Sequence, residues 1–429
     1  MSDPTALSDR LDRVEHALAA VSARLAALER GGAPTAERPP APSPVSDVDP
    51  VLPRQAAESL RGAPALAGRT CLVLGGAFLI RSLTEAGTLG PALGVAAGIA
   101  YALLWLVFAD REAARGRPES AAFHALASAL IAAPLVVEAA TRFRVLGAAG
   151  AALLLALVTA VALAVAWRRS LHALVWIQLP AATAATVLLL FRLREPLAFV
   201  VLLLALCAAS LLFAYGRGWR AQRWPMALAA DAVVLLLGGL LWLPKQPPEW
   251  LLPTPVLVAQ IGLASLYLGA FVVRLLFQSR EITPFAIAQT IAVLAVGFEG
   301  ALVVGGEATR TGLAVAALAV GVLLHGVLAR RSERQHGHGV AVAYFSTLAT
   351  FLAAEGTRVL LPAALFAPLW LLAAVGLAAL ARHGQRPVLE VHAALLALAG
   401  TVASGLGVAA VAALALPAAA TWPAPSAAA

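Results

Sequence analysis

The chain has 429 residues, of which 61% are hydrophobic and 13% charged, against about 25% charged in a soluble domain. No soluble fold has an interior large enough for this much apolar surface, so a soluble enzyme is excluded. The net charge of +8 comes mostly from arginines at the ends of apolar runs, which is typical of contact with anionic membrane lipids and argues against a nucleic-acid partner.

Residues 1–30 are predicted to form a coiled coil. Apolar residues recur there at alternating spacings of four and three, which is a heptad repeat. Arg10 and Arg24 fall at g positions and Glu15 and Glu29 at e positions, so parallel copies would pair opposite charges. We expect homo-oligomers; the alternative is a single amphipathic helix lying on the membrane or on the protein's own loops. The seam consists of Leu7, Leu11, Val14, Leu18, Val21, Leu25 and Leu28.

Residues 31–64 are rich in proline and alanine, and six prolines between Pro39 and Pro53 oppose regular structure. Such a composition predicts a disordered, semi-extended linker that separates the coiled coil from the membrane.

Residues 65–417 form a series of apolar runs, each about twenty residues long, which matches the roughly 30 Å hydrocarbon core of a bilayer. We therefore predict an all-α, polytopic transmembrane helical bundle of about thirteen spans, with a range of twelve to fourteen. Gly94 and Gly98 in the second run form a GxxxG pair suited to close helix packing. Residues 418–429 are expected to be a short disordered tail. The predicted spans are centred near Leu74, Ile99, Leu130, Ala156, Ala182, Ala205, Val234, Ala264, Val293, Ala319, Ser346, Trp370 and Ser404.

Basic residues in the loops predict the orientation of the bundle. Loops on the amino-terminal side contain about eighteen arginines, counting Arg274 at a helix end, while the opposite loops contain about eight basic residues, among them Arg358. Because positive charge is retained in the cytoplasm, the amino terminus is predicted to be cytoplasmic.

Few ionisable residues lie deep in the apolar runs, and these are the candidates for an intramembrane polar site because burying charge in hydrocarbon is costly. Asp231 lies in the middle third of its run, and Glu299 is the second acid. Gln260 and Gln289 are predicted to lie near them. The alternative is that both acids are structural and satisfied by neighbouring helices.

Motifs of catalysis and metal binding are missing from the sequence. It contains no P-loop, no HExxH zinc motif and no GxSxG nucleophile elbow. His336 and His338 form an HxH pair without a third ligand. We therefore expect no catalytic residues, no metal and no cofactor.

The stretch LVLGGAFLIRSLTEAGTLGPALGVAAGIAYALLWLVFADR, following a coiled coil and a proline-rich linker, resembles bacterial predicted membrane proteins of the domain-of-unknown-function family DUF2339. The similarity lies in a glycine-rich first span with Gly75, Gly76 and Phe78, and in Gly90 and Pro91 at the entry to the second span. Family members often have an arginine where this chain has Gly94. The resemblance implies a multi-pass protein of the bacterial inner membrane, surrounded by lipids, and implies no activity.

The leading hypothesis is a non-enzymatic scaffold or assembly component of the cell envelope that self-associates through its coiled coil. The first alternative is a transporter or flippase for an envelope precursor or a small solute, with Asp231 and Glu299 on its path. The second alternative is an intramembrane enzyme.

Overall fold

The structure is a computed structural model that describes residue 68 and residues 71–242, 246–274, 282–332, 339–384, 387–407 and 409–410. The described residues form helices joined by turns, with no strand among them, as the all-α prediction requires. The coiled-coil seam, the whole linker and the tail lie outside the described residues, so their structure stays a prediction.

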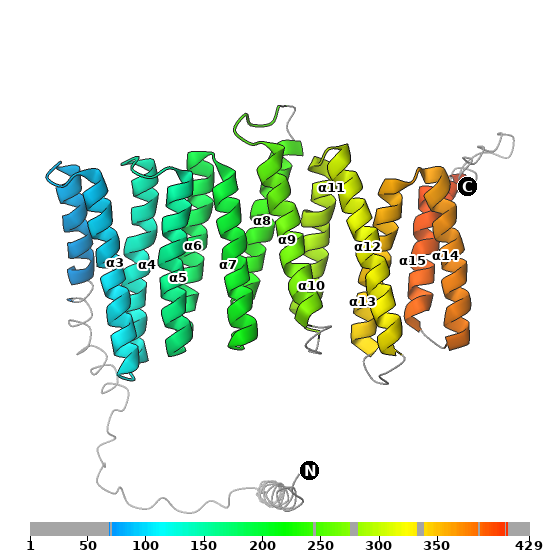
Figure 1. The fold of residues 1–429 in the computed structure, drawn as a ribbon, viewed down its shortest axis with the longest axis horizontal. Coiled ribbons are helices and arrows are strands. Elements are labelled where there is room, and N and C mark those ends of the chain that lie inside the picture. The colour runs from blue at the N-terminus through cyan, green and yellow to red at the C-terminus, as the bar shows by residue number, and fades with distance from the viewer. Residues whose placement is uncertain are drawn as a thin grey trace, which may run out of the picture. The chain divides into compact units, whose positions relative to one another are not determined.

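The helices follow one another in chain order, and successive helices run in opposite directions (Figure 1). The first covers residues 71–85. It is followed by α3 (Pro91–Ala114), α4 (Pro118–Thr141), α5 (Ala148–Arg169), α6 (His172–Leu193), α7 (Pro196–Gly216), α8 (Arg223–Trp242), α9 (Pro253–Val272), the continuous run of α10 (Pro284–Ala292), η2 (Val293–Glu299) and α11 (Gly300–Val304), then α12 (Glu307–Ser332), α13 (Gly339–Leu360), α14 (Ala363–Gly384) and α15 (Pro387–Ala403).

Ten of these elements are long and apolar enough to cross a membrane, which makes the protein a multi-pass membrane protein. They are α3 to α9, the run from α10 to α11, α12 and α14. Three predicted spans correspond to residues 71–85, α13 and α15, which are helical but not among the ten, so the total of thirteen stays a prediction. The centre predicted at Ser404 is wrong, because α15 ends at Ala403 and a turn follows at Ser404 and Gly405.

Prolines at the first positions and residues with a left-handed backbone conformation after the last positions set the helix boundaries. Helices α3, α4, α7, α9 and α10 each have a proline in their first positions, where its missing N–H is not needed. Ser170 and Arg194 adopt left-handed conformations directly after α5 and α6 and end those helices. Gly405, with φ of +76°, lies in the turn after α15.

Small residues allow the closest helix pairs to form. A Cβ atom on Gly321 of α12 would lie 2.8 Å from the carbonyl oxygen of Ala349 on α13, and one on Gly356 would lie 2.8 Å from that of Ala314. The pairs α3 with α4, α12 with α13, and α14 with α15 have the most extensive contacts. Between α4 and α9, helices also contact their second neighbours, as α4 contacts α6 and α7 contacts α9, so this part is more than one helix thick.

Large apolar side chains cover much of the outside. Leu372 is 70% exposed and Leu323 67% exposed, and many other leucines and valines share this exposure. In water such a surface would drive aggregation, whereas in a bilayer it faces lipid tails of the same polarity.

Candidate functional site

Helices α8 and α10 bring Asp231 and Gln289 together. Asp231 is half-buried near the middle of α8, and its Oδ1 accepts a hydrogen bond of 2.9 Å from Nε2 of Gln289, which is buried. A carboxylate in an apolar region needs such a partner. The pair joins the two helices, and its use as a binding site stays a prediction.

Gln260 of α9 lies in a narrow space between glycines of neighbouring helices. A Cβ atom would lie 3.1 Å from Nε2 of Gln260 if built on Gly238 and 2.5 Å from it if built on Gly300. The Oε1 atom of Gln260 is buried and has no hydrogen-bond partner in the described part of the chain. Among those residues, no hydrogen bond joins Gln260 to Asp231 or Glu299, so the four predicted residues do not form one cluster.

Glu299 belongs to a different cluster, in which it shares an arginine with a second acid. Nη2 of Arg358 on α13 donates to Oε2 of Glu299 at 3.1 Å, and Nε of the same guanidinium donates to Oε2 of Glu355. The other oxygen of Glu299, Oε1, is buried without a partner among the described residues. With all three groups ionised, this triad of Glu299, Glu355 and Arg358 carries one excess negative charge.

Glu299 is the last residue of the π-helix η2, which interrupts the run between α10 and α11. A Cβ atom on Gly297 would lie 2.8 Å from the backbone oxygen of Gln260, so η2 approaches α9 very closely. Short π-helical segments are uncommon and are often found at functional sites. From Glu299 to the end of α11 at Val304 there are five residues, or about 7.5 Å along the helix, so the triad lies near one membrane face rather than at mid-depth.

The triad adjoins a cavity of about 650 Å³ between α13, α14 and α15. Glu355 and Arg358 line the cavity, and Phe366 and Trp370 of α14 contribute aromatic rings to it. Leu395 of α15 also lines it and is 53% exposed, so the cavity opens sideways toward the lipid.

A stripe of polar side chains on α13 extends along the same cavity. Thr347 and Thr350 line it at the far end from the triad. The buried ring of His392 on α15 is held to α13 through both nitrogens, with Nε2 at 2.9 Å from Oγ1 of Thr347 and Nδ1 at 3.4 Å from Oγ of Ser346. Thr347 and Arg358 are eleven positions apart, or about 16 Å along the helix, which is about half the hydrocarbon core.

Sequence reasoning missed two members of this site. Arg358 was assigned to a loop, but the structure places it in the last turn of α13, paired with both acids. Glu355 was not selected, although its spacing of three residues from Arg358 is that of a charge pair on one helix face. An acid and a base at this spacing inside an apolar run were the available indication.

In the described part of the chain, no group of three or more histidine, cysteine, aspartate or glutamate side chains is arranged to hold a metal ion. Comparisons of the chain with protein-family models, with curated proteins and with solved structures gave no match. The function must therefore be inferred from the geometry itself.

Proposed function

We propose that this membrane protein binds and transports a small amphipathic solute that carries a positive charge, through the cavity beside α13. The observation that carries this proposal is the triad of Glu299, Glu355 and Arg358 next to a cavity of about 650 Å³. Ionisable groups in membrane spans that face a cavity are typical of substrate and ion pathways.

With all three groups ionised, the excess negative charge of the triad would favour a cation. Arg358 is shared by two carboxylates, so one guanidinium balances two acids, and Glu355 lines the cavity, where a positively charged donor can reach it. The rings of Phe366 and Trp370 add the negative faces of aromatic systems, which attract cations.

The size and apolar lining of the cavity favour a small amphipathic molecule. Ligand pockets in proteins range over about 300–1,000 Å³ and are mostly apolar with a few polar groups, as this one is. The sideways opening beside Leu395 gives a solute dissolved in the membrane a route to the triad.

Location, orientation and assembly are further parts of the proposal. The excess of arginines on one side supports a cytoplasmic amino terminus in a bacterial inner membrane, and the motifs around Gly75 and Gly90 support a relationship to family DUF2339. The heptads of residues 1–30 support homo-oligomers, and through them a scaffold role in the envelope as the second candidate function.

The test is binding of tetraphenylphosphonium, an amphipathic cation, to the purified full-length protein by equilibrium dialysis. We expect Glu355→Gln to weaken binding about tenfold, the effect of one charged hydrogen-bond acceptor. Glu390→Gln is the matched control, because Glu390 is exposed in the first turn of α15 and does not line the cavity. Equal binding by the wild type and Glu355→Gln, or an equal loss in both variants, would contradict the proposal.

A further inference from the structure

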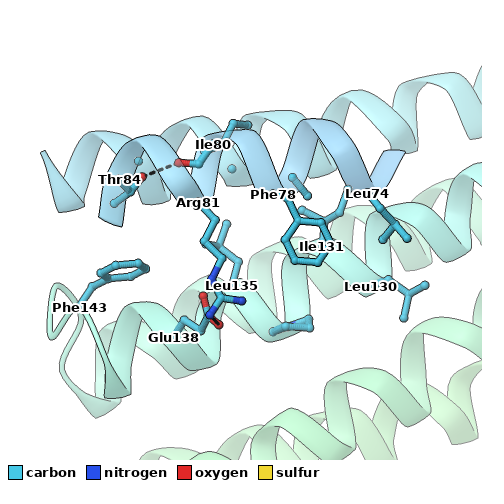
Figure 2. A pocket seen from close by; sticks show the side chains of 14 residues that line it. Leu74, Phe78, Ile80, Arg81, Thr84, Leu130, Ile131, Leu135, Glu138 and Phe143 are labelled. Atoms are coloured by element: carbon cyan, nitrogen blue, oxygen red, sulfur yellow. Dashed lines mark hydrogen bonds and ion pairs between the residues drawn. The ribbon is translucent and has the colours of Figure 1, made fainter. Parts of the chain in front are cut away.

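A second pocket, of about 180 Å³, lies at the other end of the chain's helical part, between residues 71–85, α3 and α4. Figure 2 shows Phe78 and Arg81 reaching from the first of these helices toward Leu130, Ile131 and Glu138 of α4. Most of its lining is apolar, and its charged groups lie toward one end. The pocket is therefore amphipathic.

The polar end is an ion-pair network without net charge. Nη2 of Arg81 lies 3.0 Å from Oε1 of Glu138, and Nε of Arg81 donates to Oε1 of Glu85 at 2.8 Å. Nη1 of Arg142 donates to the same Glu85 oxygen at 2.6 Å. Two arginines and two glutamates thus meet where residues 71–85 and α4 end, which is the level at which lipid headgroups lie.

The apolar end opens onto the surface that faces the membrane. Phe78 is 58% exposed and Leu130 56% exposed, although both line the pocket. In a bilayer, an opening of this kind is surrounded by acyl chains rather than water. A cavity of about 150 Å³ with an apolar lining stays dry and binds a molecule the size of benzene, so this pocket has room for a segment of one chain.

Close helix packing holds the pocket in shape. A Cβ atom on Gly94 would lie 2.0 Å from Oγ1 of Thr84, and one on Gly98 would lie 2.4 Å from Cδ2 of Leu135. The hydroxyl of Thr84 is itself fixed, because it donates to the carbonyl oxygen of Ile80 at 2.8 Å (Figure 2). The two glycines of the GxxxG pair therefore position the walls, and a preformed pocket loses little entropy on binding.

We propose that this pocket binds one phospholipid with a zwitterionic, ammonium-bearing headgroup. The acyl chain lies beside Phe78, the phosphate contacts Arg81, and the ammonium group donates to Glu138. The neutral network matches a headgroup that carries both charges, whereas a net anionic headgroup would face Glu138 and Glu85 without a cation of its own. A primary ammonium also donates hydrogen bonds to a carboxylate, which a trimethylated one does not.

The test is native mass spectrometry of the full-length protein in detergent, incubated with equal amounts of phosphatidylethanolamine, phosphatidylcholine and phosphatidylglycerol. We expect phosphatidylethanolamine to be the main bound lipid. In Glu138→Gln its binding should fall about tenfold, as for the loss of one charged hydrogen-bond acceptor. Ala77→Leu, which fills the apolar part of the pocket, should reduce the binding of all three lipids.

The matched control is Glu112→Gln, because Glu112 pairs with Arg115 at the opposite end of α3. This variant should bind lipids as the wild type does. Thermal melting checks that each variant is folded, and if Glu138→Gln is not, Ala77→Leu decides alone. Equal binding of the three lipids by the wild type overturns the proposal, as does unchanged binding in a folded Glu138→Gln or Ala77→Leu variant or an equal loss in Glu112→Gln.

Discussion

Replacing Arg358 with methionine tests whether the triad of Glu299, Glu355 and Arg358 is an ion-pair cluster inside the membrane domain. Among the residues that the structure describes, Arg358 has the one guanidinium that contacts both carboxylates, and methionine leaves a side chain of similar length. Two negative groups then remain near each other in surroundings of low polarity. The protein should lose stability because neither carboxylate keeps its charged donor.

The size of the effect follows from the exposure of the three groups. Removing one partner of a fully buried ion pair costs about 3–5 kcal/mol. Here the side chains of Arg358 and Glu299 keep 38% and 36% of their exposure, while Glu355 keeps 16%. Because exposed charges are partly screened, we expect about 2 kcal/mol for Arg358→Met.

The assay is thermal unfolding of the purified protein in one detergent, compared with the triple variant Glu299→Gln, Glu355→Gln, Arg358→Met. The triple variant has no charge left in the cluster, so it should recover much of the stability that Arg358→Met loses. Two results would refute this reasoning: Arg358→Met as stable as the wild type, or a triple variant no more stable than the single one.

Two further pairs of substitutions give predictions of defined sign. Gly297→Ala should destabilise the protein by about 1–3 kcal/mol, because its methyl group would lie 2.8 Å from the backbone oxygen of Gln260. Gly312→Ala should stabilise α12 by about 0.5–1 kcal/mol, because nothing lies within 4 Å of the added methyl group. Thermal unfolding of both variants measures the two changes in stability, and equal effects would contradict the prediction. Leu18→Glu in the heptad seam should abolish crosslinking between copies in membranes while Ala23→Glu at an outer f position leaves it intact, and crosslinking of both variants would count against the coiled coil.

The helical architecture was predictable from the sequence because hydrocarbon thickness and helix geometry fix the length of an apolar run. Pro91, Pro118 and Pro253 start helices where the apolar runs begin. The length of the last apolar run allows two tight segments, but the position of the break depends on the left-handed backbone conformation of Gly405, which the apolar pattern does not specify.

The site was less predictable, because residue depth along a span does not say which residue on another helix it faces. Asp231 and Gln289 were chosen by depth and do meet, yet they are 58 residues apart in sequence, and nothing in either run specifies the contact. The rotation of each helix about its own axis determines which side chains of neighbouring helices face each other. Glu299 was also chosen by depth, but its partner Arg358 was taken for a loop residue because positive charge near a span end is the usual mark of a membrane face.

The position of the triad suggests how binding and movement would be linked. Helices α12 and α13 contact each other closely, as do α14 and α15, but contacts from α11 to α12 and from α13 to α14 are few. In the described part of the chain, the polar contacts to α13 from the neighbouring runs include Glu299 with Arg358, Trp370 of α14 with Thr357, and His392 of α15 with Thr347 and Ser346. Under the proposed function, a cation that enters the cavity would compete for the carboxylates that hold Arg358, and so would weaken the contact between η2 and α13. Apolar packing offers no such exchange, and for this reason the proposed pathway lies at a sparse, polar interface and not among the closely packed helices from α4 to α9.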